Sequence, residues 1–209
     1  MKKKFVCLCL YSFKKKLFQL LLSLILLISS GLLSSVPARA SGFETVAKLV
    51  DLFKGFNTVA IPANILQKAS QFIDYKSMAE QALGPEQWSK LSKSEKDRFC
   101  QALQKLIEER YYPRWHKLFS KGQLICDSES LVGSRLTIKS HLTINDNSQN
   151  IIWQLDNKTA PAKVLSIQVG EKNLLAILHA RLLPRLQKSG IKSLISWLDS
   201  KSSRQTETD

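Results

Sequence analysis

The chain has 209 residues, with 31 lysines and arginines against 17 aspartates and glutamates, a net charge of +14 and 44% hydrophobic residues. It contains one long apolar run, which excludes a bundle of membrane-spanning helices, and its apolar periodicity elsewhere is too rich for a disordered protein. Residues 1–40 hold seven of the bases and no acid, so the remaining 24 bases and 17 acids leave a net charge of about +7.

Residues 1–40 have the pattern of a secretory signal peptide. Lysines at 14–16 precede an apolar run over residues 17–33, and the small residues Ala38 and Ala40 precede Ser41. We predict export through a Sec-type pathway and cleavage after Ala40. An uncleaved anchor is the alternative, because a run of 17 residues is at the short end of a membrane span.

The export prediction changes the interpretation of the four cysteines. Cys7 and Cys9 belong to the leader, so the exported part keeps Cys100 and Cys126. In an oxidising compartment these two either form a disulfide, worth about 3 kcal/mol, or remain two buried thiols that act as small hydrophobic residues. No C-x-x-C pair occurs, so neither a redox motif nor a zinc motif is indicated.

The first half of the exported chain has helical periodicity. Apolar spacing predicts a helix over residues 43–56 and a helical stretch over residues 62–83 that breaks near Asp74. Gly84 and Pro85 end that stretch.

The clearest helix start lies at Ser92, which is followed three residues later by Glu95. This pair predicts a capping box, in which each side chain accepts a hydrogen bond from the other residue's backbone amide. The helix that follows ends or kinks at Pro113, and its apolar stripe continues for one or two turns before Gly122.

The periodicity then changes to two, which predicts strands. Residues 136–145 alternate between apolar and polar side chains, and residues 151–155 and 164–169 provide two further strands. Residues 124–131 are a weaker fourth candidate. The connections are too short for helical crossovers, so the pairing should be antiparallel.

Two helices close the chain, over residues 173–188 and 191–200, with Gly190 between them. Asn173 is a good N-cap, and Pro184 should bend the first of the two helices.

Together these elements predict an α+β fold, with helices on one face of a small twisted antiparallel sheet of about four strands. Residues 41–200 form a single domain in this prediction, and residues 201–209 form a polar flexible tail.

The search for catalytic and binding motifs is negative. His116, His141 and His179 lie in different elements and have no metal-ligand spacing to one another or to cysteine. No nucleophile elbow, zinc-protease motif or phosphate loop occurs, and the basic residues do not form an aromatic-interleaved cluster that would bind nucleic acid. We therefore expect no enzyme, no cofactor, no metal and no nucleic-acid partner.

One segment does resemble a known family. Residues 72–84 (FIDYKSMAEQALG), then Trp88, then the Ser92-capped helix with Phe99 and Leu103, resemble the MlaC family, also called the toluene-tolerance family. These are periplasmic phospholipid-binding proteins with a similar D-[FY]-x-x-M-A-x-x-x-L-G run. A looser similarity covers residues 167–182 and 190–198.

The resemblance implies a monomeric periplasmic carrier whose apolar cavity, between helices and sheet, holds the acyl tails of a phospholipid. It would shuttle lipid between an outer-membrane lipoprotein complex and an inner-membrane ABC transporter with an MCE-domain subunit, the Mla system that maintains outer-membrane asymmetry. The alternative is an exported, non-enzymatic interaction module that binds an acidic partner or a membrane surface.

On this interpretation, ten apolar positions are candidates for the cavity wall, although wall and core residues share one sequence pattern. They are Phe72, Met78, Leu83, Phe99, Leu103, Ile107, Tyr111, Leu174, Leu178 and Leu182.

Overall fold

The structure, a computed structural model, describes residues 42–56 and 61–202. The predicted signal peptide therefore lies outside the described residues, as does the tail from residue 203 onward. The described helices are α2 (Gly42–Lys54), α3 (Ala63–Ser70), α4 (Tyr75–Leu83), α5 (Pro85–Lys90), α6 (Lys93–Arg110), α7 (Tyr112–Phe119) and α8 (Leu174–Ser202). The strands are β1 (Gln123–Val132), β2 (Arg135–Ile144), β3 (Asn147–Asp156), β4 (Lys163–Val169) and β5 (Lys172–Asn173).

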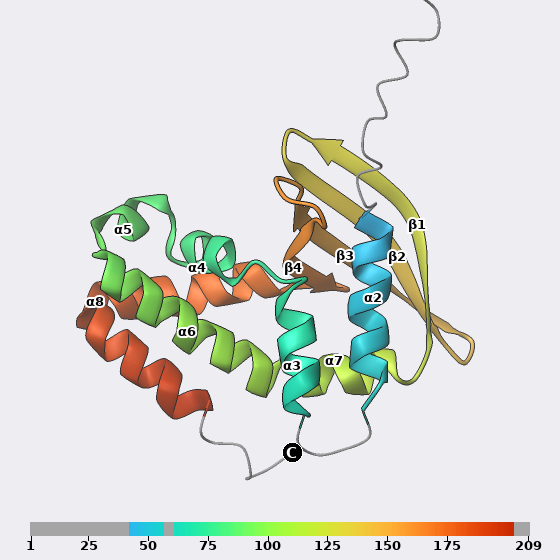
Figure 1. The fold of residues 1–209 in the computed structure, drawn as a ribbon, viewed down its shortest axis with the longest axis horizontal. Coiled ribbons are helices and arrows are strands. Elements are labelled where there is room, and N and C mark those ends of the chain that lie inside the picture. The colour runs from blue at the N-terminus through green and yellow to red at the C-terminus, as the bar shows by residue number, and fades with distance from the viewer. Residues whose placement is uncertain (1–41, 57–60, 203–209) are drawn as a thin grey trace, which may run out of the picture. The chain divides into compact units, whose positions relative to one another are not determined.

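The strands form one antiparallel sheet in the order β1-β2-β3-β4-β5 (Figure 1). The α+β fold with an antiparallel sheet is confirmed, and so are the four predicted strands, including the weak candidate that is β1. The fifth strand, β5, has two residues, which is too short for any period to show in the sequence.

One face of the sheet is apolar and covered by helices. In β2 the side chains of Leu136, Ile138 and Leu142 are buried, while Lys139 on the other face is exposed. Helix α2 packs across β1, β2 and β4 (Figure 1). The start of α2 lies close to β2, because a Cβ on Gly42 would lie 2.5 Å from the side chain of Leu136.

An aromatic cluster joins α2 and α7 to the sheet. The ring of Phe53 lies 4.8 Å from that of Tyr112 and 5.3 Å from that of Trp115, measured between centroids. The ring of Phe119 stacks on Trp153 of β3 at 5.6 Å. Such pairs add about 0.5–1.5 kcal/mol beyond the area they bury, so this cluster holds α2 onto the sheet.

The helical stretch predicted over residues 62–83 breaks near Asp74, as expected. The break arises because residues 72–74 pair with β4: the amide of Asp74 donates to the carbonyl of Val164 (3.0 Å). Asp74 then caps α4, since its Oδ1 accepts a hydrogen bond from the Ser77 amide (2.9 Å). The short helix α5, which begins at Pro85 after a positive φ at Gly84, was not predicted.

The predicted capping box of α6 is present. Ser92 Oγ accepts a hydrogen bond from the Glu95 amide (3.3 Å), and Glu95 Oε2 accepts one from the Ser92 amide (2.9 Å). Helix α6 ends at Arg110, and α7 begins two residues later with Pro113 in its first turn.

Helix α8 consists of two arms that meet at Gly190. Gly190 has φ +73° and ψ 171°, whereas Pro184 stays inside the helix, so the break lies at the glycine. Asn173 caps the first arm, because its Oδ1 accepts a hydrogen bond from the Ala176 amide (3.0 Å). The second arm turns back along α6 and ends at Ser202, two residues into the predicted tail (Figure 1).

Within the described residues, no helix is both long and apolar enough to cross a membrane. The same part of the chain contains no group of three or more histidine, cysteine, aspartate or glutamate side chains that could hold a metal ion.

The conformation of Gly190 yields a prediction. Its φ and ψ lie in a region that is essentially restricted to glycine, and a Cβ there would touch nothing within 4 Å. Gly190→Ala should therefore lower the free energy of unfolding by about 1–3 kcal/mol through backbone strain alone. Urea denaturation measures this, with Ser189→Ala as the neighbouring control, for which we expect a change within about 0.5 kcal/mol. Equal stability of the two variants would show that the chain does not turn back at Gly190.

Candidate functional site

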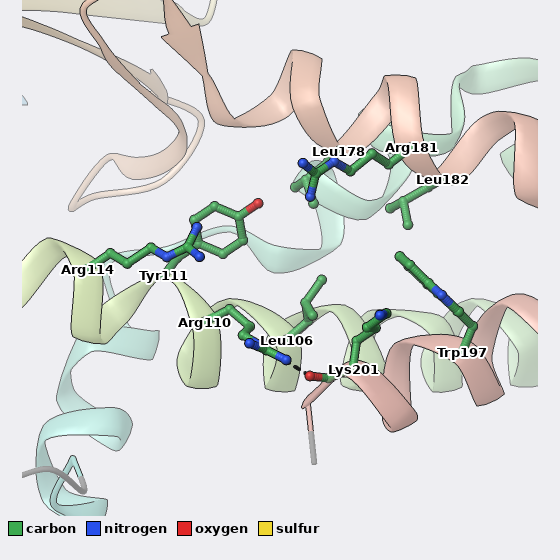
Figure 2. A pocket seen from close by; sticks show the side chains of 9 residues that line it. All are labelled: Leu106, Arg110, Tyr111, Arg114, Leu178, Arg181, Leu182, Trp197 and Lys201. Atoms are coloured by element: carbon green, nitrogen blue, oxygen red, sulfur yellow. Dashed lines mark hydrogen bonds between the residues drawn. The ribbon is translucent and has the colours of Figure 1, made fainter. Parts of the chain in front are cut away.

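A cavity of about 250 Å³ lies among α6, α7 and the two arms of α8 (Figure 2). Its walls come from helices, whereas we expected a cavity between helices and sheet. Nine of the described residues line it: Leu106, Arg110, Tyr111, Arg114, Leu178, Arg181, Leu182, Trp197 and Lys201.

One part of this cavity is apolar. Leu178 and Leu182 are one turn apart on the first arm of α8, and Leu106 faces them from α6 (Figure 2). All three are at least 92% buried. From the second arm, the half-buried indole of Trp197 points toward Leu182 (Figure 2), and the Arg185 guanidinium lies 4.3 Å from its ring centroid.

The other part of the cavity is basic, and we call Arg110, Arg114, Arg181 and Lys201 the basic mouth. Arg110 Nε donates a hydrogen bond to the Lys201 carbonyl (3.0 Å), which holds the end of α8 against α6. The Arg114 guanidinium lies 5.9 Å from the ring centroid of Tyr111. Among the described residues, no acid lines the cavity and no carboxylate forms an ion pair with any of the four.

The acids of α6 beside the mouth have other contacts. Glu108 accepts a hydrogen bond from Gln104 (2.8 Å) and lies 3.5 Å from the Tyr75 hydroxyl. Glu109 lies 4.0 Å from the Lys105 ammonium. Burial raises the pKa of Glu108 above its usual range, although the hydrogen bonds from Gln104 and Tyr75 oppose the shift.

The hydroxyls of Tyr75 and Tyr112 form a buried pair beside Glu108, with 2.6 Å between their oxygens. Burial is the main reason that the pKa of each hydroxyl is raised. Both hydroxyls therefore stay protonated at neutral pH, and the pair satisfies hydrogen bonds in the core without supplying a base.

A second hollow, a groove of about 550 Å³, lies between α2 and α3. Its lining includes Leu52, Ile65 and Phe72, with Lys48 and Lys68 among its polar residues. Because this groove is more open to solvent than the cavity among α6, α7 and α8, we take that cavity as the candidate site.

The ten predicted wall residues divide into three groups. Tyr111, Leu178 and Leu182 line the cavity, and Phe72 lines the groove. The other six are at least 96% buried within the core, and a role for them in ligand binding stays a prediction: Met78, Leu83, Phe99, Leu103, Ile107 and Leu174.

Sequence reasoning missed six of the nine lining residues: Leu106, Arg110, Arg114, Arg181, Trp197 and Lys201. A signal for Arg181 was present, since it follows the predicted Leu178 by three residues and shares its helix face. Trp197 and Lys201 reach the cavity because α8 turns back at Gly190. The apolar periodicity of the sequence does not predict the direction of that turn.

The structure does not contain the Cys100–Cys126 disulfide that the sequence left open. Cys100 lies in α6 and Cys126 in β1, and both are free, half-buried thiols. Burial raises the pKa of the Cys100 thiol to about 11 and that of Cys126 in the same direction. Both side chains pack against the core as small hydrophobic residues.

Comparison with known proteins agrees with the observed fold. A solved structure described as the phospholipid-binding protein from Ralstonia solanacearum in complex with a phospholipid superposes with a TM-score of 0.68 and 14% sequence identity. The match covers 80% of this chain and 97% of that one. No curated protein sequence matches.

A sequence model of a known family also matches the chain. The family is described as "MlaC protein", and the match spans residues 46–200. That range contains α4, the capped helix α6, the sheet and nearly all of α8. The resemblance first noted in residues 72–84 is confirmed, and the chain belongs to the MlaC family.

Proposed function

We propose that the protein is a phospholipid carrier that holds an acyl chain in the cavity among α6, α7 and α8. The observation that supports this most strongly is the cavity itself, with leucine walls at one side and a basic mouth at the other. Family membership and the phospholipid in the Ralstonia relative support the same ligand class.

The size of the cavity limits how much lipid it shields in this structure. If a methylene needs about as much room as a water molecule, roughly 30 Å³, a cavity of about 250 Å³ holds about eight methylenes. At about 0.8 kcal/mol each they contribute about 6 kcal/mol. Two complete tails hold roughly 30 methylenes, worth about 24 kcal/mol when fully buried. Binding both tails therefore requires the walls to separate, and the two arms of α8 can do so at Gly190.

Burial of the tails does not by itself give transport a direction, because a bilayer shields the tails equally well. We propose that partners set the direction: an outer-membrane lipoprotein complex at one end and an inner-membrane ABC transporter with an MCE-domain subunit at the other. The predicted signal peptide and the family support a periplasmic location for this shuttle within the Mla system.

An exported interaction module with a filled core is the alternative. The described residues favour the carrier, since a core that is only structural has no need of a cavity that α6, α7 and the two arms of α8 line with both leucines and cations. The carrier mechanism contains no catalytic step.

Native mass spectrometry tests the carrier directly. We expect the mature protein, purified without detergent, to carry one phospholipid per chain, and organic extraction should recover that lipid. A mass equal to the polypeptide alone, with no lipid in the extract, would contradict the carrier and favour the interaction module.

Trp197 provides a local test of where the acyl chain lies. Phospholipids with brominated acyl chains quench tryptophan only at short range, and Trp197 lines the cavity. Trp88 packs against Phe99 instead, with 6.5 Å between ring centroids. We expect brominated lipid to quench the tryptophan fluorescence of the wild-type protein. In Trp197→Phe, most of this quenching should be lost.

Trp88→Phe is the matched control, because it removes one tryptophan away from the cavity lining and should leave the quenching intact. If the two variants lose quenching equally, or if Trp88→Phe alone loses it, the acyl chain does not lie beside Trp197.

A further inference from the structure

We propose that the basic mouth makes the protein select phospholipids with a net negative headgroup over zwitterionic ones. The inference rests on the proposed carrier function and adds to it a recognition site for the headgroup. It concerns four side chains, Arg110, Arg114, Arg181 and Lys201, of which sequence reasoning identified none.

The cavity lining changes from apolar to basic along α6 and α7 and along the second arm of α8. On α6 and α7, Leu106 is followed at four-residue intervals by Arg110 and Arg114. On the second arm of α8, Trp197 is followed four residues later by Lys201. Figure 2 shows Trp197 toward one end of the cavity and Arg114 at the other, with Arg110 and Lys201 next to each other between them. A molecule with an apolar tail and an anionic head has its apolar and charged parts in the same order, so it matches the cavity lining from end to end.

The first arm of α8 adds a cation from the opposite wall. Arg181 lies one turn from Leu178 and faces the cavity across from α6 (Figure 2). The cations thus come from α6, from α7 and from both arms of α8, so an anion at the mouth has positive charge on more than one side.

These cations are available to a ligand. Arg110 uses Nε for the Lys201 carbonyl, and among the described residues its two terminal amino groups have no protein acceptor. Arg110 and Lys201 are also half-buried, where an unpaired charge is less well hydrated. A phosphate group matches the planar guanidinium fork and would supply the missing acceptor.

All phospholipids have a phosphate, so contacts to the phosphate give affinity but no selectivity between headgroups. Selectivity comes from the rest of the headgroup, which has an ammonium in a zwitterionic lipid and no cation in a lipid with a net negative charge. In a zwitterionic lipid the ammonium would lie among four cations, and none of the described residues that line the cavity is a carboxylate that could pair with it. The nearby Glu108 and Glu109 are engaged with Gln104 and Lys105. A glycerol headgroup on the same phosphate adds no cation and avoids this repulsion.

The test measures which lipid the protein extracts from a mixture. Delipidated mature protein is incubated with vesicles of phosphatidylglycerol and phosphatidylcholine in equal amounts and with identical acyl chains. Because both lipids share one vesicle, attraction to the surface does not bias the result. We expect the bound lipid to be enriched roughly three- to tenfold in phosphatidylglycerol, and to lose most of the enrichment in 0.5–1 M salt, where the Debye length falls to about 3–4 Å.

The double variant Arg114→Gln with Arg181→Gln tests the residues. Both side chains are exposed and neither makes a hydrogen bond within the described residues, so the fold should persist. We expect the enrichment to approach one. The control, Lys139→Gln with Lys172→Gln, removes the same charge from exposed residues of β2 and β5 and should keep the wild-type enrichment.

Each other outcome contradicts a defined claim. Bound lipid with no enrichment in the wild type overturns the headgroup site and leaves the carrier intact, whereas no bound lipid of either kind overturns both. Equal losses in the two double variants show that net charge, not the mouth, is responsible for the enrichment.

Calorimetry with glycerol 3-phosphate distinguishes a lipid ligand from a soluble phosphate ester. We expect only weak binding. Tight binding that the mouth variant abolishes would assign the mouth to a soluble ester.

Discussion

The apolar face of the antiparallel sheet is the surface around which the other elements are arranged. Side chains such as Leu136, Ile138 and Trp153 are at least 98% buried, and burial of each is worth about 1.5–3 kcal/mol. The sheet cannot bury these side chains by itself, so α2 packs across it. Phe53 of α2 stacks on Phe119 of α7, and Phe119 stacks on Trp153 of the sheet. The pairing of residues 72–74 with β4 attaches α4 to the same layer.

Helices α6 and α8 then have apolar surface left to bury against each other. Helix α6 directs Phe99, Leu103 and Ile107 into the core and presents Leu106 to α8. Because α8 turns back at Gly190, its two arms meet this surface from two sides and leave a cavity between them. The same turn brings Lys201 to Arg110, residues 91 positions apart. The cavity and its basic mouth thus have one structural cause.

Local sequence signals predicted most of the fold. The capping box at Ser92, the break at Asp74 and the interruption at Gly190 each depend on residues within a few positions, and each is present in the structure. Helix α5 and strand β5 were missed because six and two residues are too few to show a period.

The site was predicted less well, for a physical reason. A leucine that lines a cavity and a leucine in a filled core have the same neighbours in sequence, so Leu178 and Met78 could not be told apart. The basic mouth depends on which way α8 leaves Gly190, which is decided by packing against α6 and not by local propensity. The cations appeared in the sequence only as part of a general positive charge.

The lipid site that we propose is the cavity among α6, α7 and α8. A crystal structure of the mature protein purified with its native lipid tests this most directly. We expect an acyl chain in contact with Leu106, Leu178 and Leu182, and a lipid phosphate within hydrogen-bond distance of at least one cation of the basic mouth. An acyl chain in the groove between α2 and α3, with the cavity beside Leu178 filled by protein side chains, would contradict it.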